Sequence, residues 1–139
     1  MILFTIGYEG LDLQQFIAHL IRHGVDVVAD VRKLPISRKK GFSKSALAET
    51  LRSTRIDYLN FRGLGAPKEI RIELQQSGDY DRFFKKYEYN ISDKEDHLKS
   101  IYTLVNCGKK VALFCFERDP EKCHRNMVAK KIQKLDGNG

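Results

Sequence analysis

Four short apolar runs, separated by stretches with helical periodicity, constrain the fold of this chain more than any other feature of its sequence. The runs are Ile2–Ile6, Asp26–Val31, Ile56–Phe61 and Lys110–Phe116, and the last is the strongest. Continuous apolar runs bounded by turn residues are typical of strands that are buried on both faces. Because parallel strands need long crossovers, usually helices, the alternation predicts an α/β fold.

Most of the helical stretches begin at a residue that can cap a helix. The predicted N-caps, in chain order, are Asp12 with Gln15 as its capping-box partner, Ser43, Asp79, Ser92 with Glu95 as its partner, and Asp119 followed by Pro120. Serine and aspartate suit these places because their oxygens accept hydrogen bonds from the first free N–H groups of a helix. The expected element order is β-α-β-α-β-α-α-α-β-α.

This order predicts a single three-layer domain over residues 1–139, with helices on both faces of a mainly parallel sheet of about four strands. Right-handed crossovers favour the strand order 3-2-1-4, in which the long helical excursion returns the chain past strand 1. Strands 1 and 4 then form a topological switch point, and ligands bind beyond the carboxyl ends of the strands at such a point. Residues 136–139 are expected to be a frayed tail.

The composition is that of a soluble globular protein, with 42% apolar and 31% charged residues in a chain of 139. No apolar run approaches the roughly 20 residues that span a bilayer, so we expect no membrane association. Met1 leads into the first apolar run without the charged stretch of a signal peptide. We therefore expect a cytoplasmic protein whose three cysteines are reduced thiols. The sequence identifies no cofactor and no oligomeric state.

A basic run follows the second predicted strand. From Val31 to Lys44 the chain carries Arg32, Lys33, Arg38, Lys39, Lys40 and Lys44, and no acidic residue. The formal net charge of +7 also favours anionic partners. Two interpretations stay open: a solvated loop, or a loop that contacts phosphate groups, with Phe42 available to stack on bases.

The first predicted strand ends in Gly7-Tyr8-Glu9-Gly10. Glycine lets a backbone approach a ligand closely, and the helix that follows offers N–H groups to an anion. We therefore expect Gly7 and Tyr8 to contact a substrate. Glu9 either acts as a base in the cleft or caps a helix.

The second predicted strand ends with a possible ion pair. Asp30 and Arg32 alternate, so they lie on the same side of the strand end, and a pair between them would orient the guanidinium. Arg38 lies in the long loop beyond, and loops of this length are often functional. We expect Asp30 to act in proton transfer, and Arg32 and Arg38 to bind an anion.

The densest group of reactive side chains lies between the fourth predicted strand and the last helix, from Cys115 to Arg125. Cys123 is expected in the first helical turn, where the helix dipole and nearby cations lower the pKa of a thiol. It is a candidate nucleophile or redox thiol. Glu117 is a candidate general base, and the forked guanidinium of Arg125 is a candidate to bind a carboxylate or phosphate.

Three interpretations of Cys115 and Cys123 stay open: a reactive or redox thiol, zinc binding together with His124, or packing in the core. The residue types suit zinc, but the spacing C-x7-C-H matches no standard zinc motif. On a helix, neighbouring Cys123 and His124 would also point about 100° apart. We therefore assign no metal ligand from the sequence.

Together these motifs resemble one known family. They are Thr5–Gly10, Asp30–Arg32 with Pro35 and Ser37–Arg38, Gly41–Ser43, Leu64–Gly65, Gly78–Tyr80, and C-x-E-x-x-P-x-x-C-H-R from Cys115 to Arg125. The combination covers nearly the whole chain and resembles the domain of unknown function 488 family. The resemblance implies a compact α/β domain and supplies no mechanism.

The leading hypothesis is an enzyme that acts on a phosphate-bearing substrate, such as a nucleotide or nucleic acid. Its cleft would use Arg32, Arg38 and Arg125 to bind the anion, and Glu9, Asp30 or Glu117 to transfer protons. Two alternatives stay open: a nucleic-acid-binding module without chemistry, and a thiol, redox or zinc-binding protein that uses Cys115 and Cys123.

Overall fold

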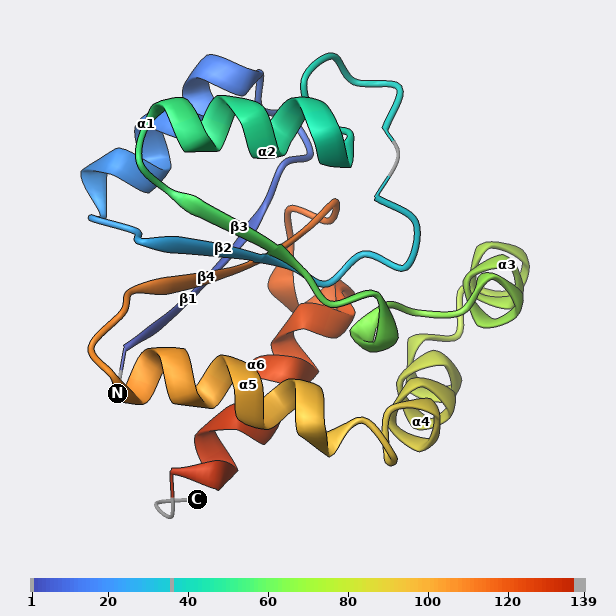
Figure 1. Cartoon of the computed structure of the whole chain (residues 1–139). Coiled ribbons are helices and arrows are strands. Elements are labelled where there is room, and N and C mark those ends of the chain that lie inside the picture. Colours follow the sequence, from blue (N-terminus) through green and yellow to red (C-terminus); the bar gives the residue numbers. More distant parts are fainter. Residues whose placement is uncertain (1, 36, 137–139) are drawn as a thin grey trace.

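A computed structural model of the chain describes residues 2–35 and 37–136 (Figure 1). Its strands are β1 (Leu3–Gly7), β2 (Val27–Asp30), β3 (Asp57–Asn60) and β4 (Val111–Cys115). Its α-helices are α1 (Leu13–Arg22), α2 (Lys44–Ser53), α3 (Lys68–Ser77), α4 (Tyr80–Asn90), α5 (Glu95–Asn106) and α6 (His124–Leu135), and the short 3-10 turns η1 (Arg62–Leu64) and η2 (Pro120–Lys122) precede α3 and α6. The predicted order of strands and α-helices is confirmed. Of the predicted tail, residues 137–139 lie outside the described residues.

The four strands form one parallel sheet in the order β1-β4-β2-β3. The predicted class, an α/β fold with helices on both faces of a parallel sheet, is confirmed. In the predicted order 3-2-1-4, however, strands 1 and 4 are exchanged: β4 lies between β1 and β2, and β1 lies at the edge. The reason is burial, since every residue of β4 is buried while those of β1 are only half-buried. The most apolar strand takes the more enclosed position.

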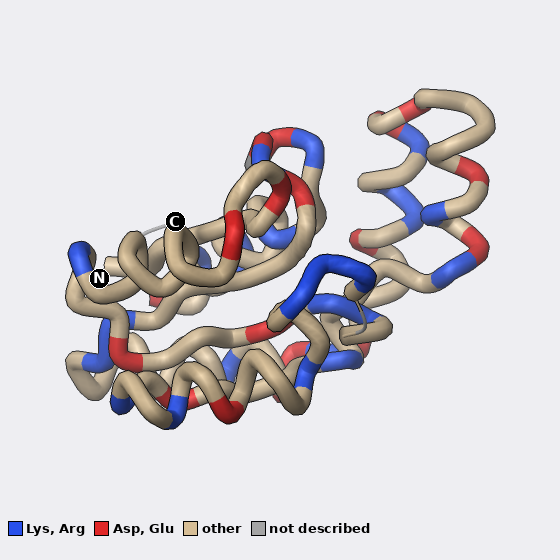
Figure 2. Tube along the Cα trace, turned by 90° about the horizontal axis from the view of Figure 1, so that it is seen from above, with Lys and Arg blue, Asp and Glu red and all other residues tan. Residues whose placement is uncertain are grey.

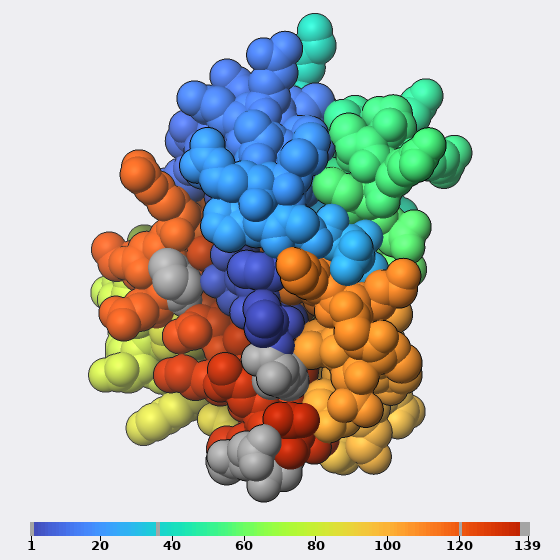
Figure 3. Space-filling view, turned by 90° about the vertical axis from the view of Figure 1, so that its left-hand side faces the viewer, coloured from blue at the N-terminus to red at the C-terminus, as the bar shows by residue number. Residues whose placement is uncertain are grey.

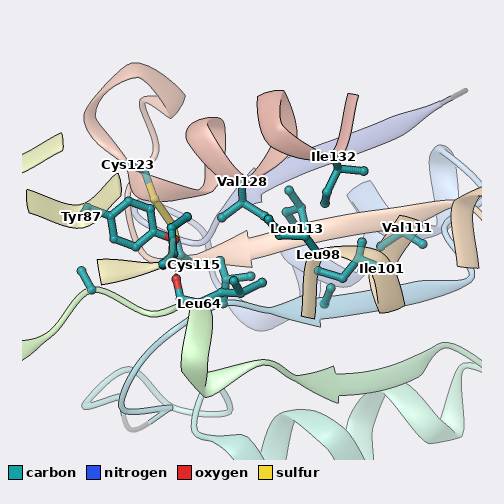
Figure 4. Close-up of a cluster of buried hydrophobic side chains, with 14 of the residues drawn as sticks. Leu64, Tyr87, Leu98, Ile101, Val111, Leu113, Cys115, Cys123, Val128 and Ile132 are labelled. Atoms are coloured by element: carbon teal, nitrogen blue, oxygen red, sulfur yellow. Dashed lines mark hydrogen bonds between the residues drawn. A yellow bond between two sulfur atoms is a disulfide. The ribbon is translucent and has the colours of Figure 1, made fainter. Parts of the chain in front are cut away.

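The helices divide between the two faces of the sheet (Figure 1). On one face, Phe16 of α1 belongs to the same buried cluster as Phe114 of β4. On the other face, Val128 of α6 belongs to a cluster with Leu113 and Cys115 of β4 (Figure 4). Successive residues of β4 thus enter two different cores, as the alternation of side chains along a strand requires.

Different segments of the chain lie at the two ends of the sheet. At the end where the strands begin, the segments that lead into β2 and β4 lie side by side, blue and orange in Figure 3. There the backbone N–H of Asp26 donates to the Lys110 carbonyl, and the N–H of Lys110 donates to the Asp26 carboxylate, both at 2.8 Å. At the carboxyl ends of the strands lie the loop after β2, the helices α3 and α4, and the turn after β4 (Figure 1).

Two of the predicted helix caps, Asp12 and Asp79, are confirmed, and two, Ser92 and Asp119, are wrong. Asp12 and Gln15 exchange the hydrogen bonds of a capping box, at 2.8 and 3.0 Å, and Asp79 accepts the N–H of Arg82 at 3.1 Å. Ser92, in contrast, does not cap α5, because its hydroxyl donates to the Tyr89 carbonyl at 2.7 Å and finishes α4. The helix α5 begins two residues later, after Lys94.

Ser43 holds the predicted N-cap position of α2, but its hydroxyl does not bond to that helix. It accepts the N–H of Ser37 at 2.9 Å and donates to the Ser37 carbonyl at 3.1 Å. Ser43 therefore closes the loop after β2 at its base. Among the described residues, no helix is long and apolar enough to cross a membrane.

Candidate functional site

A cavity of about 320 Å³, called here the carboxyl-end cleft, opens beyond the carboxyl ends of β1, β2 and β4. This is the end of the sheet at which the topology predicts a ligand site. Among the described residues, the cations that border it are Arg32, Lys33, Arg71 and Lys122, and the one bordering carboxylate is Glu117. Cys115, Cys123 and His124 also border it. The cleft therefore gathers several sequence-predicted site residues beside cations that the prediction did not include.

Two glycines let the walls of the cleft approach each other. A Cβ atom at Gly7 would overlap the backbone carbonyl of Glu117, and one at Gly65 would stand 2.2 Å from the backbone nitrogen of Lys33. The sequence predicts that the backbone at Gly7 approaches a ligand. In the structure the neighbour at this place is the turn after β4, so Gly7 positions Glu117.

Asp30 and Arg32 form the predicted ion pair, with Oδ2 and Nη2 2.7 Å apart and side chains only 0% and 7% exposed. Arg32 also donates to the Phe42 carbonyl at 2.7 Å, and the Tyr58 hydroxyl donates to Asp30 Oδ2 at 2.5 Å. Burial, followed by the hydrogen bond to Asp30, raises the pKa of Tyr58, so that hydroxyl stays a donor. Asp30 is fully enclosed, and its visible role is to hold Arg32 at the wall of the cleft.

The Tyr8 ring is packed in the core and is 4% exposed. It stacks between Phe42 and Phe114, with ring centroids 4.5 and 5.2 Å away. Phe42 is itself fully buried. The interpretation that Phe42 is available to stack on bases is therefore wrong, because the loop after β2 folds this ring into the core. The sequence does not show this fold of the loop.

Cys115 and Cys123 are joined by a disulfide (Figure 4). The expectation of three reduced thiols is wrong for this pair, whereas Cys107 is free and exposed. The pairing is invisible in the sequence because it depends on how the turn between β4 and α6 folds back. Figure 4 shows the bond beside Tyr87, whose hydroxyl donates to the Leu64 carbonyl at 2.5 Å.

Cys123 is the N-cap residue of α6 and has an extended backbone, with φ −131° and ψ 142°. The prediction that it lies in the first helical turn is wrong. The reason is that Asp119 does not cap α6: it begins the separate turn η2, where its carboxylate accepts the N–H of Glu121 at 3.0 Å. The helix starts only after that turn, and Cys123 reaches the end of β4.

His124 links the start of α6 to the end of β2. Its Nε2 lies 2.7 Å from the Val31 carbonyl oxygen, which can only accept, so Nε2 carries the proton. In the neutral ring Nδ1 is then the free acceptor, and it lies 3.8 Å from Cys123 Sγ. Burial lowers the pKa of His124 to about 4, so the ring is neutral at pH 7.

The Arg125 side chain is 1% exposed and holds the turn after β4 from inside. Its Nη1 donates to the Glu117 carbonyl and, at 3.2 Å, to Cys115 Sγ, and its Nη2 donates to the Arg118 carbonyl at 3.2 Å. Among the described residues its Nε has no hydrogen-bond partner. These contacts give Arg125 a positioning role. Both terminal nitrogens of its guanidinium, which the sequence predicts to bind an anion, already donate hydrogen bonds within the protein.

Glu9 and Glu117 come from different strand ends and border the same shallow hollow beside the carboxyl-end cleft. Glu9 Oε1 accepts the N–H of Arg118 at 3.0 Å, which ties the two strand ends together. Burial, and then the charge of Glu9, raise the pKa of Glu117. The structure therefore brings these two carboxylates to the border of one hollow.

The basic loop after β2 is visible in Figure 2, where its three consecutive cations, at residues 38–40, form a continuous blue stretch. Lys39 Nζ donates to the Tyr8 carbonyl at 3.3 Å, so this cation holds the loop onto the strand end. Arg38 is exposed, and it is not among the described residues that border the carboxyl-end cleft. Arg38 therefore lies outside the group that the structure brings together.

Sequence reasoning missed Arg71 and Phe116 as site residues. Arg71 reaches the cleft from α3, where its Nε donates to the Ala66 carbonyl at 3.1 Å. Its helix carries no motif, so the sequence holds no signal for it. Phe116 directly follows β4 and is 45% exposed at the border of the cleft. The sequence does hold a signal for Phe116, because this aromatic residue directly follows a run predicted to be a buried strand.

A second hollow, of about 470 Å³, lies along the edge strand β1 and the helix α1. His19 and His23 of α1 and its C-cap border it. It is larger, but apart from Glu9, Arg118 and Arg125 its walls come mainly from apolar residues of the sheet edge. We place the functional site in the carboxyl-end cleft because the cations and the cysteines meet there.

Residues 12–132 match the model of a family described as a domain of unknown function, DUF488. The matched segment includes the loop after β2 and the turn after β4, and it confirms the resemblance that the motifs predict. No curated protein and no solved structure gives a significant match to the chain.

Proposed function

The chain belongs to the DUF488 family, and because that family has no assigned activity, we propose a function from the cleft itself. The protein is an enzyme that acts on a phosphate-bearing substrate, in the class of nucleotides. The observation that carries this proposal is the charge of the carboxyl-end cleft, which four cations and one carboxylate border among the residues that the structure describes. Such a surplus of positive charge in a concave site draws in anions.

The cations divide into fixed and movable groups. Arg32 is held by Asp30 and by the Phe42 carbonyl, so it contributes a charge of fixed position. Lys33, Arg71 and Lys122 are exposed and reach the cleft from three different segments. A phosphate group has several acceptor oxygens, and cations that approach it from different sides can each donate a charge-assisted hydrogen bond.

The helix α6 adds to the attraction. It has 12 residues, and its N-cap, Cys123, borders the cleft. The N-terminal end of a helix carries a partial positive charge and free N–H groups, which favour a bound anion. The N-terminal end of α6 therefore favours a negatively charged ligand, as the four cations do.

The size and one aromatic side chain favour a nucleotide over a larger nucleic acid. A volume of about 320 Å³ is at the low end of the range of roughly 300–1,000 Å³ for small-molecule sites. Phe116 is partly exposed at the rim, and an aromatic ring there offers a face on which a base can stack.

The proposed roles of the acidic residues follow from their positions. Glu117 borders the cleft and is placed to exchange a proton with a bound substrate. Glu9 lies next to it and holds the turn through the N–H of Arg118. Asp30 is enclosed and acts through Arg32. Glu117 is the proposed catalytic residue, and the other two are positioning residues.

Binding of nucleotides and of inorganic phosphate, and turnover of nucleotides, test this function at low salt with wild-type protein and four variants. Lys122→Ala is expected to weaken both ligands by about 10-fold, because each charge-assisted hydrogen bond contributes roughly 1.5–3 kcal/mol. Phe116→Ala is expected to weaken nucleotides and leave inorganic phosphate unchanged. Lys109→Ala is the matched control, since Lys109 is a lysine at the opposite end of the sheet.

Turnover of a bound nucleotide is expected to fall by about 100-fold or more in Glu117→Gln, which keeps the shape of the side chain and removes its proton chemistry. Nucleotide binding that is equal in wild type, Lys122→Ala and Lys109→Ala would remove the cleft from the proposal. Binding without turnover of any phosphate ester would leave a binding protein and overturn the enzyme.

A further inference from the structure

The disulfide and the imidazole ring of His124 lie at the carboxyl-end cleft, but these side chains have no part in the proposed phosphate binding. We propose that, once the disulfide is reduced, Cys115, Cys123 and His124 bind one zinc ion. One donor atom from each residue lies within 4.8 Å of the other two. Thiolate and imidazole are the ligands that zinc prefers in proteins, and three protein ligands with an open fourth position are typical of catalytic zinc sites.

The orientation of His124 supports this site. Its Nε2–H donates to the Val31 carbonyl at 2.7 Å, which leaves Nδ1 with a free lone pair on the side of Cys123. Zinc-binding histidines usually donate their other ring N–H to a carbonyl or carboxylate, because this fixes the ring and its tautomer. His124 therefore already has the supporting contact that a metal ligand needs.

Arg125 provides a second supporting contact. Its Nη1 lies 3.2 Å from Cys115 Sγ, inside the protein. An N–H donor beside sulfur stabilises the thiolate, the form in which cysteine binds a metal. Both cysteines are 2% exposed, so the site is shielded from bulk water except through the cleft.

The sequence argues against zinc because neighbouring helical residues point apart, and the backbone of Cys123 removes this objection. Two neighbouring helical residues would point about 100° apart, but Cys123 is extended and precedes the helix. Its side chain and that of His124 can therefore serve one ion. The Cα atoms of Cys115 and Cys123 are 7.7 Å apart, wider than the roughly 4.4–6.8 Å of most disulfides. Two thiolates that share a metal ion tolerate this wider spacing because they need not touch each other.

The disulfide and the metal site are two states of the same pair. A phosphine reductant supplies two electrons to the S–S bond and becomes a phosphine oxide with an oxygen from water, and two thiols result. Zinc then replaces the two thiol protons, which are released to the solvent. All three residues border the carboxyl-end cleft, so a zinc ion that they held would lie beside the place proposed for the phosphate group. A zinc ion there would polarise a phosphoryl oxygen.

The metal is tested by spectroscopy, which does not depend on turnover, so failure of this inference is distinguishable from failure of the proposed function. Full-length protein is reduced with a phosphine, freed of metal, and titrated with Co²⁺ as the probe. We expect one Co²⁺ per chain, a thiolate-to-cobalt charge-transfer band and the visible bands of tetrahedral cobalt, all abolished by one equivalent of Zn²⁺. The disulfide-bonded protein is expected to show none of these bands.

Cys115→Ser, Cys123→Ser and His124→Asn are each expected to weaken Co²⁺ binding by more than about 100-fold, beyond the 10–100-fold typical of supporting residues. Cys107→Ser is the matched control and should leave the spectrum unchanged. A second measurement uses wild type alone, in case a variant fails to fold. Zn²⁺ should protect Cys115 and Cys123 of the reduced protein from alkylation, and it should leave Cys107 reactive.

Two results would overturn the site: reduced wild type that binds no Co²⁺, or a cobalt spectrum that disappears in Cys107→Ser and persists in Cys123→Ser. Equal alkylation of Cys115 and Cys123 with and without Zn²⁺ would have the same meaning. The pair would then be a disulfide without a metal-bound state.

Discussion

A Cβ atom built on Gly7 would stand 1.7 Å from the backbone carbonyl oxygen of Glu117. The end of β1 and the turn after β4 are therefore in direct backbone contact. The same turn is also held by Arg125, which donates to this carbonyl. The position of Glu117 in the cleft thus depends on a residue that has no side chain.

Gly7→Ala is expected to destabilise the protein by about 3 kcal/mol or more, because the methyl group meets rigid backbone and overpacking alone costs roughly 1–3 kcal/mol. Urea unfolding measures the free energy. Gly63→Ala is the control, since its nearest neighbour is the side chain of His97, at 2.8 Å, which can move away. Equal losses in the two variants would contradict the role given to the Glu117 carbonyl.

Asp30→Asn is expected to cost about 3–5 kcal/mol of unfolding free energy, because it leaves the buried charge of Arg32 without its counter-ion. Asp57→Asn makes the same change at an exposed place on β3 and should change stability by less than about 0.5 kcal/mol. Comparison of the two urea midpoints checks the prediction. A loss of under 1 kcal/mol in Asp30→Asn would show that the ion pair is not as enclosed as described.

Tyr58 is expected to make stability fall at alkaline pH. Its hydroxyl donates to Asp30 Oδ2, near Arg32, and its pKa in the folded protein is raised above the usual value of about 10. The folded state therefore holds this proton more tightly than the unfolded state. The stabilisation is fully present below the unfolded pKa and is lost as pH rises above about 10 through the folded pKa.

The measurement is the unfolding free energy of wild type and Tyr58→Phe between pH 8 and pH 11. Wild type should be the more stable at pH 8, by roughly 1 kcal/mol for the lost hydrogen bond. The difference between the two proteins should shrink as the pH rises above about 10. A difference that stays constant over the whole range would show that Tyr58 ionises equally in both states.

Local patterns were enough for the elements and the fold class. The capping box of Asp12 and Gln15 involves contacts between near neighbours in the chain, so it could be read before any tertiary structure was known. The strand order could not, because the place of β4 depends on which strand buries more surface against helices on both faces. The predicted cap at Ser92 is wrong for a related reason. Its hydroxyl can bond either to the start of α5 or to the end of α4, and the packing of α4 decides between them.

The candidate site divides in the same way. The motifs at the strand ends identified Glu9, Arg32, Glu117 and Cys123 as residues of one end of the sheet, because parallel strands that alternate with helices must all finish at the same end. Only the tertiary structure separated enclosed groups such as Asp30 and Arg125 from those that face the cleft, and only it joined Cys115 to Cys123 and brought in Arg71. The physical reason is that burial, pairing and access depend on contacts between distant segments, whereas helices and strands depend mainly on the periodicity of near neighbours.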